Sequence, residues 1–366
     1  KEISLKKLGV SLSSDMDEKP IGYFDTYDNK IFLVTYDGTF YLSNSLSEIK
    51  NDNFKFTKIS NTKDEIKLHP NDDANYRNIK LRDILIHRNN IFLVSNDSKF
   101  DNDRDGYLAS IKVFKGIVSP DIKNIELSTF FSTKENYLDS KYDVDWSHTG
   151  GRIVHYKNDD YLLSVADFHL KPYDVLVDKV TSDKSVAGKT FLINEDEVKL
   201  FSKGHRNIQG LFYDKKNELV FSSEHGPTGG DEINLIQNGR DYGWPRSSYG
   251  TLGFGFANHP RKHKKYGFQE PLYYWWPYNC APSEITIVNE NFVKDWKESL
   301  LVSCLSGNHL NGTSFIRFVY DKNLNKLERK EQHYIGDRIR DFKYLNKEKI
   351  LIMLLEGKKS FAFMYK

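Results

Sequence analysis

Histidine, arginine and asparagine side chains gather in short polar segments, each of which comes just before an apolar stretch. The clearest segments are DWSHTGG at 145–151, GHRNIQ at 204–209 and GDRIRD at 336–341. Their chemically active side chains are His148, His205, Arg206, Asn207, Arg338 and Arg340. A neutral imidazole can accept a proton near neutral pH, and guanidinium groups bind carboxylates through paired hydrogen bonds. These residue types suit proton transfer and the recognition of an anion, provided that the fold brings the segments together.

The elements that must position these residues are six similar β-hairpins. Each has an apolar stretch, a short turn rich in Asn, Asp and Lys, and a second apolar stretch. The copies span 22–35, 83–95, 152–165, 210–223, 284–303 and 341–354. Most are followed by a third apolar strand, such as SFIRFVY at 314–320. Almost no stretch has the i, i+3, i+4, i+7 pattern of an amphipathic helix.

Six similar sheets of three or four strands predict an all-β, six-bladed β-propeller that forms a single domain over residues 1–366. A jelly roll or a stacked sandwich also has many short strands, but it does not need six similar units. We expect the opening residues ISLKKLGV to add an outer strand to the last sheet. In a propeller the segments before the hairpins converge at one end of the channel, so the polar segments should form one pocket.

Composition excludes several classes of protein. Hydrophobic residues make up 39% and charged residues 28%, which is typical of a globular protein and not of a disordered one. The formal charge of +2 gives no field that would attract nucleic acid. No apolar run is long enough to span a bilayer. The segment SVAGKT at 185–190 is not a phosphate loop, because Asp183 stands where the first glycine is required.

The chain has only two cysteines, Cys280 and Cys304. Two cysteines are too few for a disulfide framework or for a thiolate metal site. Two buried free thiols and a single disulfide both stay open at this point.

Longer segments carry a family resemblance. GHRNIQGLFYD at 204–214 and SEHGPTGGDEINLIQNGRDYGWP at 223–245 resemble the glucose/sorbosone dehydrogenase family, which includes soluble glucose dehydrogenases and aldose sugar dehydrogenases. HTGGRIV at 148–154, CAPSEITIV at 280–288 and GDRIRDF at 336–342 follow the order of that family. The resemblance implies an oxidoreductase that uses pyrroloquinoline quinone (PQQ) and Ca²⁺ to oxidise a sugar (aldose) or a related alcohol or aldehyde.

The resemblance also implies roles for the polar residues. His148 matches the general base, a role that typically contributes about 10²–10⁴-fold to the rate. Arg206 and Asn207 match residues that contact the quinone, and Arg206 would help to polarise its reactive carbonyl. Arg338 and Arg340 match residues that pair with the carboxylates of the cofactor. Without the resemblance, His148 could simply bond a backbone carbonyl, and the two arginines could form surface salt bridges.

The loop SEHGPTGGDE at 223–232 is the predicted metal site. Gly226 and Pro227 match residues whose backbone carbonyls bind Ca²⁺, an ion that prefers oxygen ligands. A tight turn is the alternative explanation for these residues. Asp231 and Glu232 could bind the metal directly, but we expect them to brace the loop through hydrogen bonds to backbone N–H groups.

Aromatic residues precede CAPS at 280–283. Trp276 and Tyr278, with Trp275 beside them, could stack on a sugar or could pack between blades. One position departs from the family pattern: a lysine that usually contacts the cofactor is absent from SCLSGNHL at 303–310, where Ser306 stands in its place.

The sequence therefore predicts a quinoprotein sugar dehydrogenase with a small sugar as substrate and an external electron acceptor as partner. Relatives are exported, so we expect a periplasmic or secreted protein, in which Cys280 and Cys304 could form a disulfide. The chain starts at Lys1, as a processed chain would. One alternative is a non-catalytic propeller that binds a carbohydrate or a protein at the same face. Another is a calcium-dependent hydrolase such as a lactonase, which the family segments oppose.

Overall fold

The computed structural model describes residues 4–9, 22–36, 38–51, 53–61, 81–103, 105–119, 121–123, 125–133, 136–137, 148–251, 262–290, 292–305, 312–356 and 360–366. The chain forms two compact units. One contains Pro20–Ala187 and Phe191–Lys199, and the other contains Lys1–Lys19, Gly188–Thr190 and Leu200–Lys366. The single domain over residues 1–366 stays a prediction.

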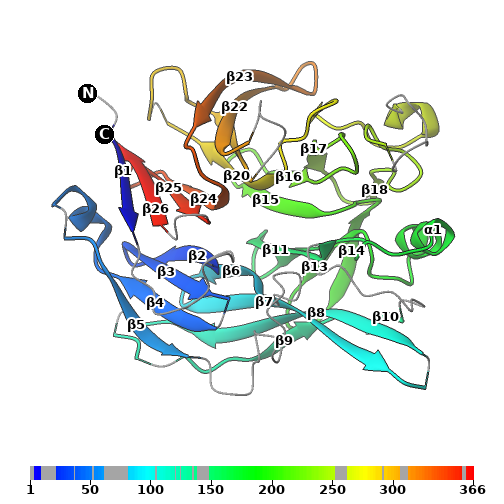
Figure 1. Cartoon of the computed structure of the whole chain (residues 1–366), viewed down its shortest axis with the longest axis horizontal. Helices are drawn as coiled ribbons and strands as arrows, with labels where there is room; N and C mark the ends of the chain where they lie inside the picture. Colours follow the sequence, from blue (N-terminus) through cyan, green and yellow to red (C-terminus); the bar gives the residue numbers. More distant parts are fainter. Residues whose placement is uncertain are drawn as a thin grey trace. The chain divides into compact units, whose positions relative to one another are not determined.

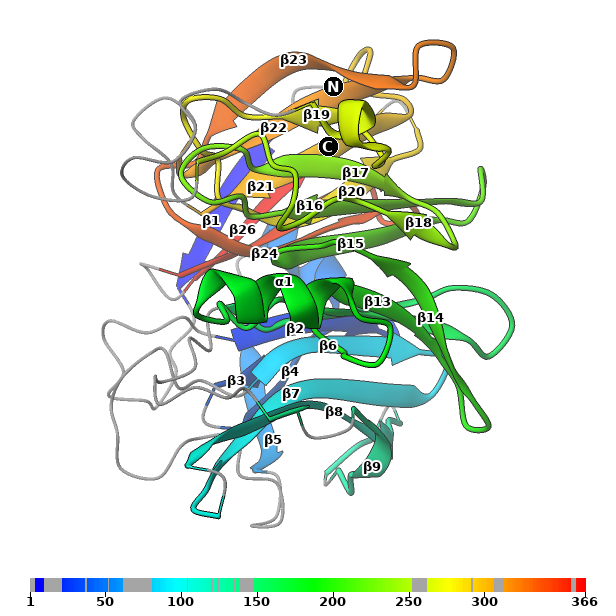
Figure 2. The ribbon, with the colours of Figure 1, turned by 90° about the vertical axis from the view of Figure 1, so that its right-hand side faces the viewer.

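The unit that contains Pro20–Ala187 is built from antiparallel sheets. The first sheet has the order β2 (Gly22–Tyr27), β3 (Lys30–Thr35), β4 (Thr39–Ser43) and β5 (Phe56–Asn61). The second has β6 (Leu81–His87), β7 (Asn90–Asp101) and β8 (Gly106–Ile117), and both β9 (Ser128–Ser132) and β10 (Asn136–Tyr137) pair with β8. The third begins with β11 (Gly150–His155) and β12 (Tyr161–Val165). This unit also contains the 3-10 helix η1 (Leu46–Asn51) and the helix α1 (Tyr173–Thr181), which is labelled in Figure 2.

The third sheet continues through β13 (Lys189–Ile193), β14 (Val198–Lys203) and β18 (Arg240–Asp241), and the division into units passes through it. The other unit holds three further sheets. The fourth sheet has the order β15 (Ile208–Asp214), β16 (Leu219–Glu224), β17 (Glu232–Ile236) and β19 (Tyr273–Tyr274). The fifth has the order β20 (Pro282–Val288), β21 (Ser299–Cys304), β22 (Ser314–Asp321) and β23 (Lys326–Tyr334). The sixth has the order β1 (Ser4–Gly9), β26 (Ser360–Tyr365), β25 (Ile350–Leu355) and β24 (Ile339–Leu345). The 3-10 helix η4 (His263–Tyr266) lies in the segment that precedes β19.

The predicted fold is confirmed: the protein is an all-β, six-bladed β-propeller with six sheets, and each predicted hairpin forms the first two strands of a sheet. The expected outer strand is also confirmed, because β1 pairs antiparallel with β26, with Leu5 opposite Met364 (Figure 1). The sequence did not reveal α1. This helix has only nine residues and buries only Leu176 and Val180, which is too little for a helical period to stand out.

A repeated backbone feature sets the inner end of the blades. Five of the six first strands contain a register shift near their start, at positions 81/83, 150/153, 208/210, 282/284 and 339/341. Acidic residues of the first strands bond the first strand of a neighbouring sheet, both in β6, which has the shift, and in β2, which has none. Asp25 Oδ2 accepts a hydrogen bond from the Ile86 N–H at 2.6 Å, and Asp83 Oδ2 accepts one from the Ile153 N–H at 2.9 Å. In the other unit β15 contacts β20, and β20 contacts β24.

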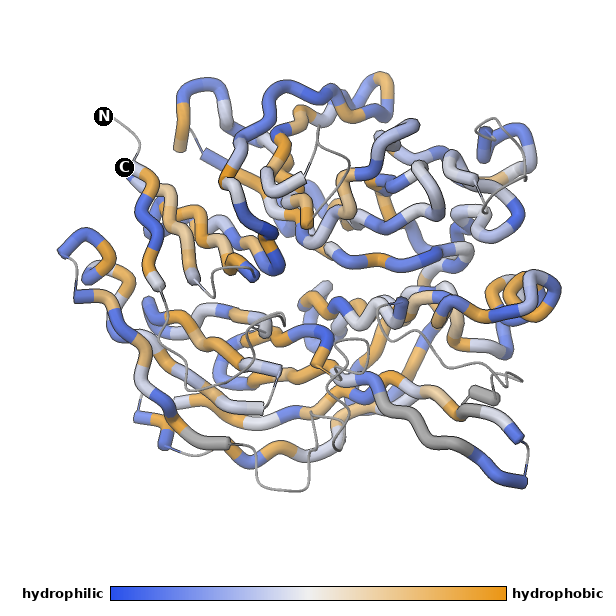
Figure 3. The backbone as a smooth tube through the Cα atoms, viewed as in Figure 1, coloured by the Kyte–Doolittle hydropathy of each residue, from blue (hydrophilic) through white to orange (hydrophobic). Residues whose placement is uncertain are grey.

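The core of the blades is largely apolar. All six residues of β25 are buried, and β25 and β26 carry hydrophobic colours along most of their length (Figure 3). Burying one large aliphatic or aromatic side chain contributes about 1.5–3 kcal/mol, so these strands form a rigid base for the polar residues at their ends. In the part of the chain that the structure describes, no helix is long and apolar enough to cross a membrane.

Candidate functional site

The glycine-rich loop that joins β16 to β17 is tightly folded. A Cβ atom at Gly226 would lie 2.1 Å from the Gly230 carbonyl oxygen, so only glycine fits there. Gly229 and Gly230 have φ angles of +76° and +71°, a conformation that glycine adopts at little cost. The His225 N–H donates to the Asn207 carbonyl at 3.0 Å, which ties the loop to the start of β15. The carbonyls of Gly226 and Pro227 therefore belong to a fixed turn.

The Asp231 carboxylate holds this turn through hydrogen bonds from backbone N–H groups, as the sequence led us to expect. Its Oδ1 accepts the Gly226 N–H at 2.9 Å, and its Oδ2 accepts the N–H groups of Cys280 at 2.9 Å and Ala281 at 2.7 Å. Burial raises the pKa of Asp231 to about 6, although these hydrogen bonds and the Arg206 charge pull it down. One carboxyl group thus joins the loop to the segment that precedes β20.

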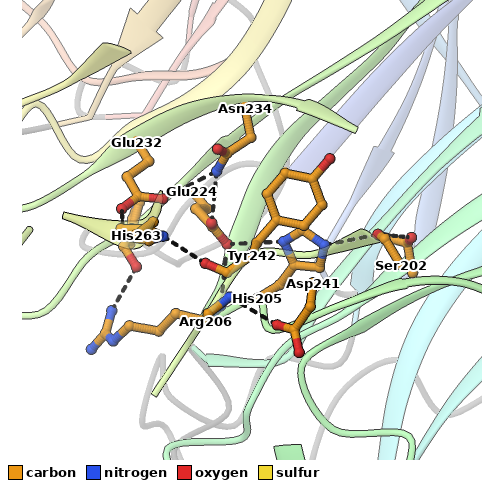
Figure 4. A network of polar contacts seen from close by, with 12 residues as sticks. Ser202, His205, Arg206, Glu224, Glu232, Asn234, Asp241, Tyr242 and His263 are labelled. Carbon is orange, nitrogen blue, oxygen red and sulfur yellow. Dashed lines mark hydrogen bonds and ion pairs between the residues drawn. The ribbon is translucent and has the colours of Figure 1, made fainter. Parts of the chain in front are cut away.

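Glu232 differs from the expectation that it would bond backbone N–H groups. Its partners are side chains: the His263 Nε2 at 3.2 Å and the Asn234 Nδ2 at 3.2 Å (Figure 4). His263 also donates from Nδ1 to the Tyr242 carbonyl at 2.8 Å. Burial lowers the pKa of His263, but Glu232 and the Tyr242 carbonyl together raise it above its ordinary value. The pair fastens η4 to β17.

Arg206 lies directly on the predicted metal loop. Its Nη1 donates to the His225 carbonyl at 2.9 Å and to the Gly226 carbonyl at 2.7 Å. The guanidinium carbon lies 5.4 Å from the centre of the Trp244 ring, which is a cation–π distance. The Arg206 N–H bonds Glu224 Oε2 at 3.1 Å. Arg206 and Gly226, which are 20 residues apart in sequence, are therefore in direct contact.

His205 and Asn207, on either side of Arg206, are buried. His205 Nε2 lies 2.8 Å from Ser202 Oγ, and its Nδ1 lies 3.6 Å from Glu224 Oε2 (Figure 4). The ring has no exposed surface, so we assign His205 to packing and not to chemistry. Asn207 Oδ1 accepts a hydrogen bond from Gln209 Nε2 at 2.8 Å, which orients the Asn207 amide.

Arg338 and Arg340 share one carboxylate. The Nε of each donates to a different oxygen of Glu356, at 2.5 Å for Arg338. The Glu356 side chain is only 7% exposed, whereas that of Arg338 is 42% exposed. Burial raises the pKa of Glu356, but Arg340 and Arg338 outweigh it and hold the pKa below its ordinary value. Arg338 comes directly before β24 and Arg340 lies within it, and both point at a common anion, which in this structure is Glu356.

The aromatic segment at 275–278 has one ring in the core and two rings at the surface. Trp275 is buried and packs edge-on against Phe318, whereas Trp276 and Tyr278 are 39% and 44% exposed. Trp276 lies against Gly229, because a Cβ atom there would be 2.6 Å from the Trp276 ring. The exposed Trp276 ring thus stands beside the glycine-rich loop, where a ligand could reach it.

Two further features lie next to this segment. Asn279 Nδ2 donates to the Pro227 carbonyl at 3.3 Å. Cys280 and Cys304 form a disulfide, which settles the question that their spacing had left open.

His148 lies in the other unit, at the start of β11. Its Nδ1 is 3.8 Å from Asp167 Oδ1, and its ring stacks on His169 with the centroids 4.7 Å apart. Asp167 is buried, and its carboxylate lies on the Nδ1 side of the His148 ring. An imidazole backed by a carboxylate is a suitable general base. Its position relative to Arg206 stays a prediction.

The position of Ser306 and the identity of the metal ligands stay predictions. Ser306 lies outside the described residues. Among the residues that the structure describes, no group of three or more His, Cys, Asp and Glu side chains could hold a metal ion. The candidate metal site therefore rests on backbone and amide oxygens.

Comparison with known proteins identifies the family. The chain belongs to the Glucose / Sorbosone dehydrogenase family, whose description matches residues 126–360. It is 30% identical over 213 residues to the uncharacterized protein slr1608 of Synechocystis sp., covering 53% of this chain and 50% of that protein. It is 28% identical over 169 residues to the aldose sugar dehydrogenase YliI of Escherichia coli, covering 43% and 45%. The chain thus spans about half the length of the curated relatives it matches.

Solved structures share the fold over the whole chain. The soluble aldose sugar dehydrogenase of Escherichia coli in its apo form superposes with a TM-score of 0.75 at 19% identity, covering 100% of this chain and 99% of that one. The PQQ-bound aldose sugar dehydrogenase of Streptomyces coelicolor gives 0.67 at 16% identity, covering 100% and 98%. At these identities the likeness shows the fold, a propeller shared with sugar dehydrogenases.

Proposed function

We propose that this member of the family is a PQQ- and calcium-dependent dehydrogenase that oxidises an aldose or a related alcohol or aldehyde. The observation that carries the proposal is the polarity around the Gly226 and Pro227 carbonyls. Each accepts a hydrogen bond from a side chain, and the donor to Gly226 is the cationic Arg206. The Gly226 oxygen accepts from a cationic guanidinium and the Pro227 oxygen from a neutral amide, so both carbonyls are turned toward donors and can serve as ligands of a hard cation.

The residues present fit a calcium ion. Backbone carbonyls are suitable Ca²⁺ ligands, and Asp231 fixes the Gly226 N–H so that the turn is formed in advance. A cation bound to Gly226 would face the positive charge of Arg206. An anionic cofactor offsets this repulsion, so we expect calcium and cofactor to strengthen the binding of each other.

The residues present also fit a polycarboxylate. Arg338 and Arg340 are cationic and both pair with Glu356, and the Arg338 side chain is 42% exposed. The exposed side chain of Arg338 could form paired hydrogen bonds with a cofactor carboxylate. Ser306 stands in place of the expected lysine, so these arginines would carry more of the cofactor binding than in a relative with that lysine.

In the proposed reaction His148 accepts the proton of the substrate hydroxyl at Nε2. The Asp167 carboxylate facing Nδ1 favours the neutral tautomer with the proton on Nδ1 and stabilises the imidazolium that forms. Arg206 and Asn207 contact the cofactor, and Trp276 and Tyr278 stack on the sugar ring. When bound, the quinone would supply the acceptor for the hydride of the substrate carbon, and calcium would supply a Lewis acid.

The two electrons then leave to an external acceptor. The family resemblance favours a periplasmic or secreted location for this chemistry. The disulfide between Cys280 and Cys304 supports that location, because disulfides persist in oxidising compartments.

The test combines cofactor binding with turnover. We expect the protein to bind PQQ in the presence of Ca²⁺, followed by absorbance, and then to reduce an artificial dye with one or more aldoses. H148A should bind PQQ normally and lose turnover. If wild-type protein binds a sugar but no PQQ, the proposal is wrong and a non-catalytic carbohydrate-binding propeller takes its place.

A further inference from the structure

Asn279 is held in place on its C-terminal side by two restraints. The next residue, Cys280, forms the disulfide with Cys304, and its N–H bonds Asp231 Oδ2 at 2.9 Å. The other oxygen of Asp231 binds the Gly226 N–H. A single buried carboxyl group therefore fixes the Asn279 segment and the glycine-rich loop at a set distance from each other.

The side chain of Asn279 is poised beside the Pro227 carbonyl with one polar atom unused. Its Nδ2 donates to the Pro227 oxygen over a long 3.3 Å. Its Oδ1 is buried and has no hydrogen-bond partner among the described residues. Leaving a buried amide oxygen unbonded costs about 1–3 kcal/mol, so the position needs an explanation other than bracing of the loop.

A half-turn of the carboxamide exchanges its oxygen and nitrogen without moving the backbone. Oδ1 then faces the Pro227 carbonyl oxygen at a similar separation. Two such oxygens repel each other unless a cation lies between them. Calcium binds oxygens at about 2.3–2.6 Å, and neighbouring ligands on one ion lie about as far apart as these two atoms.

We propose that the carboxamide oxygen of Asn279 is a third protein ligand of the cation held by the Gly226 and Pro227 carbonyls. This inference rests on the proposed function for the identity of the cation as calcium. Without the cation, Asn279 donates Nδ2–H to Pro227; with it, the amide turns and offers Oδ1. All three protein ligands are neutral, so the charge balance comes from the cofactor.

The competing explanation is that Asn279 only braces the loop through its N–H donor. The two explanations differ for aspartate, which keeps the oxygen and adds charge but has no N–H to donate. If Asn279 is a ligand, N279D binds Ca²⁺ more tightly, because calcium affinity rises with ligand charge. If Asn279 is a brace, N279D and N279L weaken binding alike.

The experiment is calorimetric titration of the full chain with Ca²⁺, first alone and then in the presence of PQQ. We expect N279L to weaken Ca²⁺ binding about tenfold or more and N279D to strengthen it about tenfold. The matched control is N289D. Asn289 follows β20 at its other end and also has a buried Oδ1 without a hydrogen-bond partner in the described parts of the chain. N289D should bind Ca²⁺ as the wild type does.

Circular dichroism and the urea midpoint establish that each variant is folded. Equal Ca²⁺ affinity in wild type, N279L and N279D overturns this inference alone and leaves the proposed function standing. Parallel weakening in both Asn279 variants also overturns it, in favour of the brace. No Ca²⁺ binding by wild type, with or without PQQ, removes the proposed function and this inference together.

Discussion

Replacing Glu356 by glutamine tests how the two candidate cofactor arginines are held. Glu356 and Arg340 are 7% and 12% exposed, so their ion pair is buried, whereas Arg338 is 42% exposed and its pair is screened by water. Removing one partner of a buried pair costs about 3–5 kcal/mol. Glutamine keeps one oxygen to accept a hydrogen bond, so we expect E356Q to fall at the low end of this range. The free energy of unfolding should decrease by about 3 kcal/mol at pH 7.

The pH dependence gives this prediction its second test. The folded pKa of Glu356 lies below its unfolded value, so its contribution is present above the unfolded pKa, near 4.5, and is lost as pH falls through the folded pKa. The stability difference between wild type and E356Q should therefore stay constant from pH 8 to pH 6. It should shrink below about pH 4.5, where the carboxylate becomes protonated.

Urea unfolding, followed by fluorescence at several pH values, measures both effects. The matched control is E298Q, since Glu298 forms an exposed ion pair with Lys216 at 2.5 Å and its loss should leave the urea midpoint unchanged. The reasoning fails if E356Q is as stable as wild type at pH 7. It also fails if the difference persists undiminished at pH 3.

Three further outcomes are expected. H148A should lower kcat in the dye assay about 10²–10⁴-fold, and D167N should lower kcat less. Neither variant should change PQQ binding. A wild-type kcat in H148A would exclude His148 as the general base. H263Q should lose more stability at pH 5.5 than at pH 8.5, because the raised pKa of His263 means that its contribution is present below the unfolded pKa and is lost as pH rises through the folded pKa. Replacing Cys280 and Cys304 by serine should cost roughly 3 kcal/mol in urea unfolding, given their separation of 24 residues, and no change would contradict a bridge in solution.

The sequence was enough to predict the architecture because the signal repeats. Six hairpins with the same alternation leave few folds to choose from, and all six form as predicted. The short helices had no repeated sequence pattern that could predict them. The helix α1 and the 3-10 helix η4 are too brief for periodicity, and both depend on tertiary packing.

The candidate site was predictable where its residues are neighbours in one segment. Gly226, Pro227 and Asp231 lie within six positions, so the bracing role of Asp231 could be inferred from the loop itself. Glu232 was different, because its partner His263 follows it by 31 residues in a segment with no strand pattern. The Glu232 carboxylate is buried, so it needs a charged or hydrogen-bonding partner. Its partners in the structure are the side chains of His263 and Asn234 rather than backbone N–H groups.

The residues that the sequence did not reveal share one property: they are buried acids behind a predicted functional group. Asp167 faces His148, Glu224 holds the Arg206 N–H, and Glu356 joins the Arg338–Arg340 pair. Glu224 lies in the segment SEHGPTGGDE but was given no role there, and Asp167 and Glu356 lie outside the segments that carry the family resemblance. Each of the three acids holds or faces a group with a predicted role at the site.

This arrangement has a consequence for how the site responds to mutation. An acid that acts only by orienting a functional group has nothing left to orient once that group is gone. Asp167 faces His148, and its Oδ1 also accepts the His169 N–H at 2.9 Å. If its effect on kcat passes through His148, the further change D167N should not lower kcat any more in H148A. An Asp167 that supported the fold independently would instead add its own loss in the double variant. A double-mutant cycle on kcat therefore separates an orienting carboxylate from a structural one, which neither single variant can do.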